Sequence, residues 1–300
     1  MSTLKLRAVI QELNRVNLDV VAMDHLVSRF WAASRGTTAP IGGSAAELYF
    51  RARKCNTRPT SAAELGAPPA DKVVGFQRCN PPNQPMFYAA SKRITALLES
   101  RVQAGDIVYL SHWVGAEAMR VNRILHSPLL DDTPLNHMFY AFIETIFSKR
   151  IHADFSTDYK LTAAATKVFT TEVRSSEDST TEQTGKVGLA YPSVANKFDG
   201  YNTVFHADVA QRLLRCLHVT ELRIAGIDEA TGEVSVEFLD NANVVTEDGC
   251  IVWMGDPHAI PAALGSNRDF LLMRSNGTTW SLPMNSGQTT AYDVERFLHE

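Results

Sequence analysis

Three arginines in the first third of the chain have the side-chain chemistry needed to bind an anionic group. Arg51 and Arg53 alternate with other residues in a strand-like segment, 48–53, so both are expected on one face of a strand. Arg78 lies beside Asn80 in a loop that contains prolines. A guanidinium presents a rigid fork of donors suited to phosphate oxygens. A single isolated arginine, however, is more often an exposed side chain that pairs with a neighbouring acid.

A carboxylate and a serine follow further along the chain. Glu99 lies near the end of a largely apolar segment predicted to be a helix, where a carboxylate is often an ordinary solvated charge. Ser193 comes directly after Pro192, which restricts the backbone and lets the hydroxyl point to a fixed place. No G-x-S-x-G motif surrounds Ser193, so a nucleophilic serine hydrolase is a poor fit. A simple turn at this position is the alternative interpretation.

The periodicity of apolar residues predicts the elements that must position these side chains. Apolar residues recur at three- and four-residue steps over 4–34, which predicts one or two helices. Ser91 is a plausible N-cap for the next helix. The segment 54–72 is predicted to be a long loop, and 171–186 a solvated insertion. Strands are predicted at 48–53, 86–90, 107–113, 187–190, 201–205, 222–227, 234–239, 250–254 and 270–273, and helices at 92–102, 134–149, 158–170, 207–214 and 290–299.

The composition excludes several classes of protein. With 45% hydrophobic and 21% charged residues over 300 positions, a sizeable buried core is expected. The net charge of -4 argues against a dedicated nucleic-acid binder but not against a small anionic ligand. The four cysteines form no C-x-x-C pair, so we expect free thiols and no metal site. Since no secretory signal or membrane-spanning apolar run is present, a soluble protein of the cytoplasm is expected.

Taken in order, the candidate segments resemble those of the RES domain family. The resemblance covers roughly 47–220 and departs from the family pattern at Gln77, where a glycine is usual, and at Cys79. The stretch between Glu99 and Ser193 is also longer than in the compact toxin members. The matching segments are Arg51 in its strand, the loop 64–69, Arg78-Cys79-Asn80-Pro81, the strand with Tyr88, the helix segment 95–99 that ends in Glu99, 159–162, Tyr191-Pro192-Ser193-Val194 and 200–202.

The resemblance implies an α+β fold similar to that of ADP-ribosyltransferases, with a mixed, bent sheet surrounded by helices. Three segments are then expected: an N-terminal helical extension at 1–40, the RES domain at 47–220 with an insertion around 114–186, and a C-terminal β-rich extension at 221–300. The N-terminal helices should cover the sheet or form a contact in a homodimer. The sequence does not choose between these two arrangements.

The resemblance also implies an activity on NAD. Members of the family cleave the bond between nicotinamide and ribose with water or phosphate, and some transfer ADP-ribose to a protein. The family includes bacterial toxins of toxin–antitoxin systems, so an Xre-type antitoxin or another immunity partner is expected. No metal or cofactor is required, because NAD is the substrate. The implied catalytic residues are Glu99, Arg51 and Ser193, and the implied substrate-binding residues are Arg78, Asn80, Tyr88 and Asn202.

Three functions therefore remain open from the sequence. The first is an NAD glycohydrolase or phosphorolase that acts as a bacterial toxin. The second is a protein ADP-ribosyltransferase that uses the same pocket, since the acceptor depends on the rim of the pocket and on partners. The third is a non-catalytic interaction module that keeps the RES scaffold, because fold alone does not fix function. Direct binding to nucleic acid or to a membrane is expected in none of them.

Overall fold

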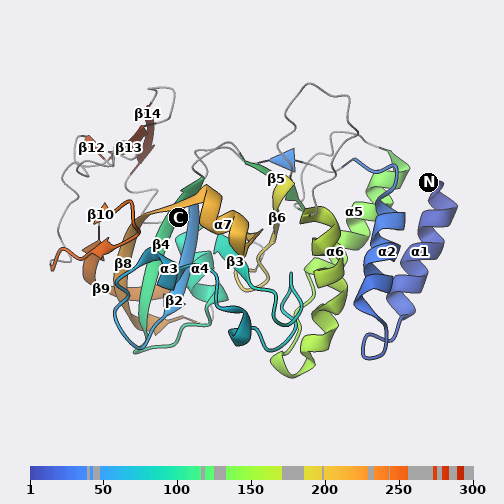
Figure 1. The fold of residues 1–300 in the computed structure, drawn as a ribbon, viewed down its shortest axis with the longest axis horizontal. Coiled ribbons are helices and arrows are strands. Elements are labelled where there is room, and N and C mark those ends of the chain that lie inside the picture. Colours follow the sequence, from blue (N-terminus) through green and yellow to red (C-terminus); the bar gives the residue numbers. More distant parts are fainter. Residues whose placement is uncertain are drawn as a thin grey trace. The chain divides into compact units, whose positions relative to one another are not determined.

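The fold is that of a computed structural model, which assigns the chain to two compact units, each assembled from three segments (Figure 1). Unit 1 contains Met1–Ser44, Ala67–Tyr88 and Glu117–Arg212, and unit 2 contains Ala45–Gly66, Ala89–Ala116 and Leu213–Glu300. The predicted division into 1–40, 47–220 and 221–300 stays a prediction. The structure describes residues 1–38, 41–42, 48–115, 119–124, 133–170, 186–197, 199–228, 233–242, 244–255, 273–275, 279–283 and 289–293.

Unit 1 has a helical core. Helices α1 (Thr3–Arg15) and α2 (Met23–Ser34) pack against each other and against α5 (Pro134–Phe147) and α6 (Lys160–Thr170). The apolar stripe that predicted the N-terminal helices is the face they bury, and the prediction is confirmed. The fully buried side chains of this helical core include Leu6, Leu26 and Phe30 from the N-terminal helices and Phe139, Ile143, Ile146 and Phe147 from α5.

The strands of unit 1 form a mixed sheet. The short β1 (Ile41–Gly42) pairs antiparallel with β5 (Arg120–Arg123), and β5 pairs parallel with β6 (Lys186–Pro192). β6 in turn pairs antiparallel with β7 (Tyr201–His206), and α7 (Ala207–Leu213) follows. Gly188 lies opposite Phe205, and a Cβ at Gly188 would come within 2.7 Å of that ring. Only glycine therefore fits this position of the pairing.

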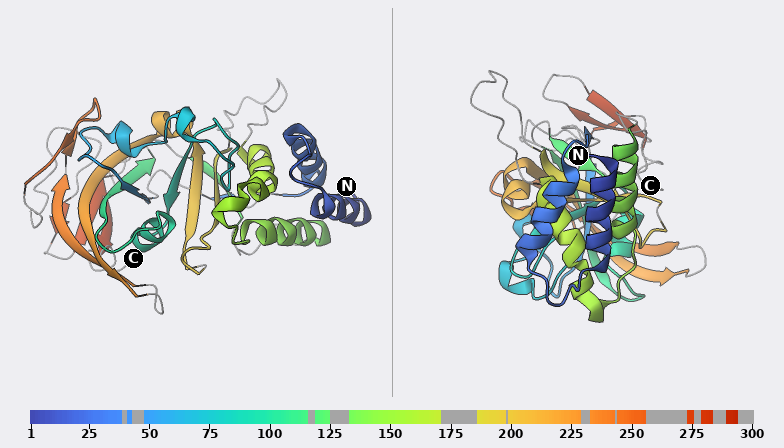
Figure 2. Two further views of the ribbon diagram at one scale, coloured as in Figure 1. Left: turned by 90° about the horizontal axis from the view of Figure 1, so that it is seen from below. Right: turned by 90° about the vertical axis from the view of Figure 1, so that its right-hand side faces the viewer.

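Unit 2 is built on antiparallel strands. β2 (Leu48–Lys54) pairs with β4 (Ile107–Gly115), β4 with β8 (Leu214–Ile227), and β8 with β9 (Val234–Ala242). Figure 2 shows β8 and β9 as long, curved strands. Irregularities in the pairing at Glu221/Leu222 and Ile224/Gly226 accompany this curvature, since bulges bend a strand. The two units together confirm the predicted α+β class with mixed strand pairing.

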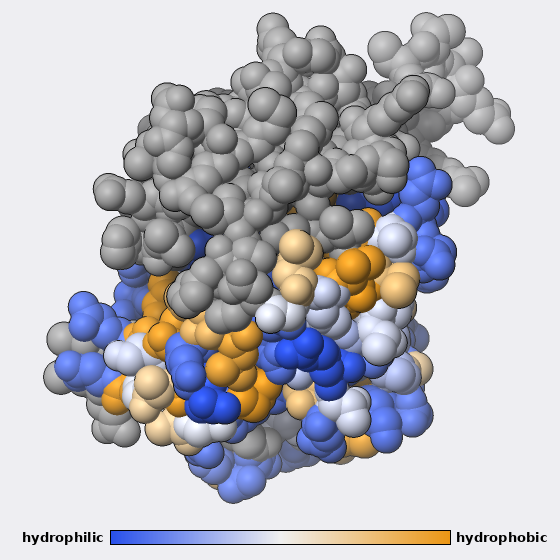
Figure 3. Space-filling model, turned by 90° about the vertical axis from the view of Figure 1, so that its left-hand side faces the viewer, coloured by the Kyte–Doolittle hydropathy of each residue, from blue (hydrophilic) through white to orange (hydrophobic). Residues whose placement is uncertain are grey.

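Short elements complete unit 2. α3 (Ala62–Leu65) follows β2, and α4 (Arg93–Glu99) packs against β2 and β4. The remaining strands are β10 (Val244–Val245), β11 (Ile251–Val252), β12 (Met273–Ser275), β13 (Thr279–Pro283) and β14 (Thr289–Asp293), which make the predicted C-terminal region β-rich. Figure 3 shows a face on which apolar patches alternate with hydrophilic ones (Figure 3).

Strand β3 (Met86–Ala90) is divided between the units, because the boundary falls after Tyr88. Its part in unit 2 pairs with β2 through Phe50 and Ala90. The bounds of β3 agree with the predicted strand. Within the described part of the chain, no helix has the length and the apolar character needed to cross a lipid bilayer.

Several local predictions were wrong. The expected loop 54–72 contains α3 and the 3-10 helix η1 (Ala70–Lys72). Both helices are too short for their apolar residues to show a helical periodicity in the sequence. Ser91 is not the N-cap of α4, because the helix begins one residue later and Lys92 takes that position. The expected helix 290–299 begins instead with strand β14, which is held by pairing with β13. Residues 171–185, 270–272 and 294–300 lie outside the described residues.

Other boundaries shifted by a few residues. The predicted helix 158–170 is split into η2 (Ala153–Tyr159) and α6. Strand β8 begins at Leu214, eight residues before the predicted strand 222–227, because its pairing with β4 runs back to Gly115. Long-range pairing of this kind leaves a weak local signal in the sequence.

Candidate functional site

A tight turn in unit 1 carries Arg78 and Cys79 at its tip. The backbone amides of Gln77 and Asn80 each donate to the other residue's carbonyl oxygen, at 2.9 and 3.3 Å. The Tyr88 hydroxyl accepts from the Cys79 amide at 3.0 Å and donates to Oδ1 of Asn80 at 2.5 Å. Asn80 is only 1% exposed, so the bond from Tyr88 supplies a hydrogen-bond partner to a buried polar group. Unit 1 thus brings Arg78, Asn80 and Tyr88 together.

The Arg78 side chain is directed by the end of a helix. Its Nη1 donates to the carbonyl oxygens of Phe147 at 2.6 Å and Lys149 at 3.2 Å, and its guanidinium lies 5.1 Å from the ring centre of Tyr159. Phe147 is the last residue of α5, and a cation is stabilised beside the carbonyls at a helix C-terminus. The guanidinium plane is therefore fixed from one side by backbone oxygens and from another by an aromatic ring.

Cys79 links this turn to strand β6. Burial raises the pKa of its thiol to about 12, while hydrogen bonds with the side chains of Thr166, Tyr191 and Tyr88 and the charge of Arg78 act in the opposite direction. Burial also raises the pKa of the Tyr88 phenol well above its ordinary value, and the nearby Cys79 adds to that shift. Both groups are therefore protonated at neutral pH, so Tyr88 keeps its role as a donor and Cys79 is no nucleophile.

Ser193 and Asn202 lie at the adjoining ends of β6 and β7. Ser193 is fully buried, its hydroxyl accepts from the Asn196 amide at 3.1 Å, and its own amide donates to Gly200 O at 3.0 Å. Ser193 thus closes the turn between the two strands. Asn202, 5% exposed, pairs in register with Tyr191, whose ring lies 5.5 Å from that of Phe147. Tyr191 therefore connects these strand ends to Cys79 and to the end of α5.

Arg51 and Arg53 in unit 2 reach the same short segment from one face of β2, as their alternation predicts. Arg51 Nε donates to Leu65 O at 3.0 Å, while Arg53 Nη1 donates to Glu64 O at 2.5 Å and to Gly66 O at 3.3 Å. These oxygens belong to the last residues of α3 and to its C-cap. The carbonyl end of α3 therefore determines the direction of both guanidinium groups.

Glu99 is the last residue of α4, and its side chain is exposed. The next residue, Ser100, donates from its hydroxyl to Ala52 O at 2.8 Å, and Ala52 follows Arg51 on β2. This bond attaches the end of α4 to the middle of β2. Unit 2 therefore carries Arg51 and Glu99 on two elements that are directly joined.

The predicted site residues are distributed over both units. Arg51 and Glu99 belong to unit 2, while the other five belong to unit 1. Their union in one pocket stays a prediction. Among the described residues, no group of three or more His, Cys, Asp or Glu side chains is arranged to hold a metal ion.

Sequence reasoning missed the groups that orient the arginines. The oxygens of Phe147 and Leu65 are backbone atoms, so no residue type at those positions announces them. Tyr191 was seen only as part of its motif, and Cys79 only as a departure from the family pattern. One feature of the sequence could have indicated them. Cys79 and Tyr191 are apolar or aromatic residues beside polar motif residues, and such residues are often buried and hold the polar ones in place.

Comparison with known proteins bears on the same stretch of the chain. The family model described as "RES domain" matches residues 48–225. This confirms the resemblance inferred from the sequence over 47–220. The match contains all seven predicted site residues. None of the curated proteins compared with the chain matches it.

Proposed function

The chain belongs to the RES domain family, and we propose that it is an enzyme that cleaves the bond between nicotinamide and ribose in NAD, with water or phosphate as the acceptor. The observation that carries the proposal is the family match over 48–225, since all seven predicted site residues lie within it. The arrangement of these residues within each unit supports the proposal.

The chemistry sets three requirements. Loss of nicotinamide leaves positive charge on the ribose, as in other glycosidic cleavages with oxocarbenium character. A site must therefore anchor the pyrophosphate, place a carboxylate near the sugar and hold the nicotinamide ring so that it departs in one direction. Water or phosphate then forms the new bond to the ribose carbon. The protein supplies position and electrostatic stabilisation.

In unit 1, Arg78 suits the role of a pyrophosphate anchor. Backbone oxygens fix one edge of its fork, so little side-chain freedom is lost when a phosphate binds. Tyr88 and Asn80 hold the turn that carries Arg78, and we assign them contacts with the nicotinamide riboside. Asn202 adds a polar contact beside them. We assign Ser193 the task of holding the ends of β6 and β7, since its hydroxyl accepts from a turn amide.

In unit 2, Arg51 supplies a second anchor for phosphate and Glu99 the carboxylate. The exposure of Glu99 at the end of α4 leaves it accessible to a ligand. Its carboxylate would bind the ribose hydroxyls and stabilise the positive charge that develops on the sugar. NAD is the substrate in this scheme, so neither a metal nor a cofactor takes part.

The biological role that we propose is that of a bacterial toxin which depletes NAD in the cytoplasm and is held in check by an Xre-type antitoxin or another immunity partner. The net charge of -4 argues against direct binding to nucleic acid, and it leaves room for a small anionic substrate, which needs only a local basic site. The N-terminal helices pack on α5 and α6 within unit 1. A homodimer remains part of the proposal.

Incubation of the purified 300-residue chain with NAD tests the activity. The expected result is release of free nicotinamide, with ADP-ribose formed in water or its phosphorylated form when phosphate is present. NAD labelled in its adenylate part identifies the alternative enzyme, because an ADP-ribosyltransferase would leave the label on a protein band. Well-folded protein that releases no nicotinamide under any of these conditions would instead support a non-catalytic module.

A further inference from the structure

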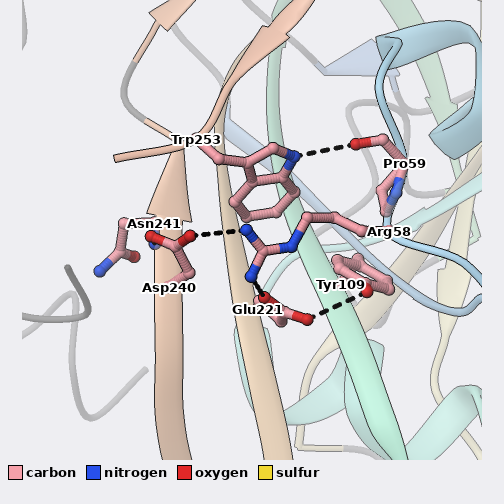
Figure 4. Close-up of polar contacts among 7 residues, drawn as sticks. All are labelled: Arg58, Pro59, Tyr109, Glu221, Asp240, Asn241 and Trp253. Atoms are coloured by element: carbon pink, nitrogen blue, oxygen red, sulfur yellow. Dashed lines mark hydrogen bonds and ion pairs between the residues drawn. The ribbon is translucent and has the colours of Figure 1, made fainter. Parts of the chain in front are cut away.

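Arg58 lies in a partly buried cluster of unit 2 that the proposed reaction does not use (Figure 4). Its Nη1 donates to Oδ2 of Asp240 at 2.8 Å, and its Nη2 donates to Oε2 of Glu221. The side chains of Asp240 and Glu221 are 2% and 10% exposed. Carboxylates this deeply buried need a charged partner, so Arg58 is bound to this place more firmly than a surface arginine would be.

An aromatic side chain closes the cluster from the other side. The guanidinium of Arg58 lies 4.8 Å from the ring centre of Trp253, and the indole Nε1 donates to the carbonyl oxygen of Pro59 at 2.9 Å. The Tyr109 hydroxyl donates to Oε1 of Glu221 at 3.1 Å. Arg58 and Pro59 are thus held by β8 through Glu221, by β9 through Asp240 and by the segment after β11 through Trp253. Figure 4 shows the indole lying over the guanidinium.

Backbone pairing continues from the same place. The Ile251 amide donates to Thr60 O at 2.8 Å, and the Ala62 amide donates to Gly249 O at 2.8 Å. Ser61 and Cys250 form an antiparallel bridge between these two bonds. The segment 249–251 therefore pairs with the residues that lead into α3.

These contacts fix the start of α3, whose end holds the arginines. Ser61 is the N-cap and forms a capping box with Glu64. The helix has only four residues, a length at which a helix has no stability of its own in water. Its position must come from its surroundings. Any shift of its start is carried to Leu65 O, the acceptor of the Arg51 Nε bond.

We propose that Arg58, together with Asp240 and Trp253 beyond the end of the family match, positions the guanidinium of Arg51 through α3. The relevance of this clamp to catalysis rests on the proposed NAD-cleaving function. Arg58 is a positioning residue, since it acts on Arg51 through the segment 59–65. Asp240 and the segment 249–253 thereby gain a defined task, which is to complete the support of a family arginine.

Steady-state kinetics of the full chain with NAD test the proposal in Arg58→Met, Arg58→Lys and a matched control, Arg223→Met. Arg223 lies on β8 and, like Arg58, pairs with an acid on β9, in this case Glu237, but the side chains of Arg223 and Glu237 are both about half exposed. A phosphate anchor acts on substrate and transition state alike, so its misplacement raises KM more than it lowers kcat. We expect KM to rise about tenfold or more in Arg58→Met and less in Arg58→Lys, and to stay within about twofold in Arg223→Met.

An unchanged KM in folded Arg58→Met would overturn the proposal, and so would an equal change in Arg223→Met. If Arg58→Met does not fold, Trp253→Phe takes its place, because it keeps the aromatic ring and removes the bond to Pro59 O. It should raise KM by a smaller factor, and a wild-type KM in this variant would count against the clamp.

A second measurement does not depend on NAD cleavage. Urea unfolding of the wild type, Arg51→Met, Arg58→Met and the double variant forms a cycle that measures coupling between the two arginines. If α3 links them, the shift of the midpoint in the double variant is smaller than the sum of the single shifts. Additive shifts overturn the proposal. A wild type that releases no nicotinamide refutes the proposed function alone, and the cycle still decides whether the clamp exists.

Discussion

The hydroxyl of Tyr88 donates to Oδ1 of Asn80 and at the same time accepts from the backbone amide of Cys79, at 2.5 and 3.0 Å. One phenol thereby ties the middle of β3 to two neighbouring residues of the turn that displays Arg78. Two neighbouring polar groups depend on this single oxygen. The position of the proposed phosphate anchor therefore depends on a residue that is ten positions further along the chain.

Tyr88→Phe is expected to lower the free energy of unfolding by about 1–3 kcal/mol, since it deprives a buried amide oxygen and a backbone N–H of their described partner. The loosened turn should also raise KM for NAD. Tyr159→Phe is the control, because it keeps the ring beside the Arg78 guanidinium. Chemical denaturation of both variants makes the comparison, and equal stability would contradict the assigned role of the phenol.

Arg78 has a structural role and a proposed phosphate-binding role, which a substitution can separate. Arg78→Met is expected to destabilise the protein by about 1–2 kcal/mol, since it removes a cation and hydrogen bonds from the C-terminal end of α5. Arg78→Lys keeps the charge there and should recover much of that stability. A lysine lacks the planar fork, so KM for NAD should stay raised in both variants. Thermal unfolding and kinetics measured on both variants separate the effect on stability from the effect on KM. Full recovery of KM in Arg78→Lys would argue against a bidentate phosphate anchor.

Acid should destabilise unit 2 through two histidines. His112 and His218 face each other across β4 and β8, with 3.5 Å between their Nδ1 atoms. Burial, followed by the charge of Arg93, lowers the pKa of both imidazoles, that of His218 to about 3. The unfolded chain then binds more protons than the folded one below the ordinary histidine pKa of about 6.5. Stability must fall as the pH drops from there towards 3.

Replacing one of these histidines should reduce the loss of stability at acidic pH. His218→Gln removes one titrating imidazole, so the fall in the free energy of unfolding between pH 6.5 and 5 should shrink by about 2 kcal/mol. His137→Gln, a change at an exposed position on α5, serves as the control for the loss of a histidine outside this pair. Urea unfolding at several pH values measures both. The same pH dependence in all three proteins would refute the assignment.

The cysteines should differ sharply in reactivity. Burial raises the pKa of Cys79 and of Cys216 to about 12, whereas Cys250 is exposed. The thiolate is the species that reacts with iodoacetamide. At pH 8, Cys250 should be alkylated first, and Cys79 should react only when the protein unfolds. Peptide mapping by mass spectrometry follows each site, and early labelling of Cys79 would show that its turn is open.

The elements closest to the motifs were the easiest to predict. The bounds of β3 and those of β2, to within one residue, follow from local alternation of side chains, and α1 and α2 from a repeated apolar stripe. These patterns are local, so a single sequence contains them. The motif residues in unit 1 could be named because their order resembles that of the RES family, although their mutual hydrogen bonds could not be predicted.

The remaining features depend on distant parts of the chain. Arg58 finds its two acids 163 and 182 residues further along, and it was not among the predicted site residues. α3 and its capping box lie in the segment predicted to be a loop, 54–72, and the helix is held by pairing with a distant segment that begins at Gly249. Strand β14 overrides a helical pattern by pairing with β13. In each case tertiary pairing decides the structure, and local propensity does not show it.

The most direct test of the account is nicotinamide release from NAD by the wild type and by Glu99→Ala, assayed together with and without phosphate. Glu99 is exposed, so removal of its side chain leaves no cavity in the core. Glu247→Ala, at an exposed position in a turn of unit 2, is the control. We predict release by the wild type and the control, and at least a roughly hundredfold slower release by Glu99→Ala. Equal release by folded wild type and Glu99→Ala, or none by either, would contradict the account.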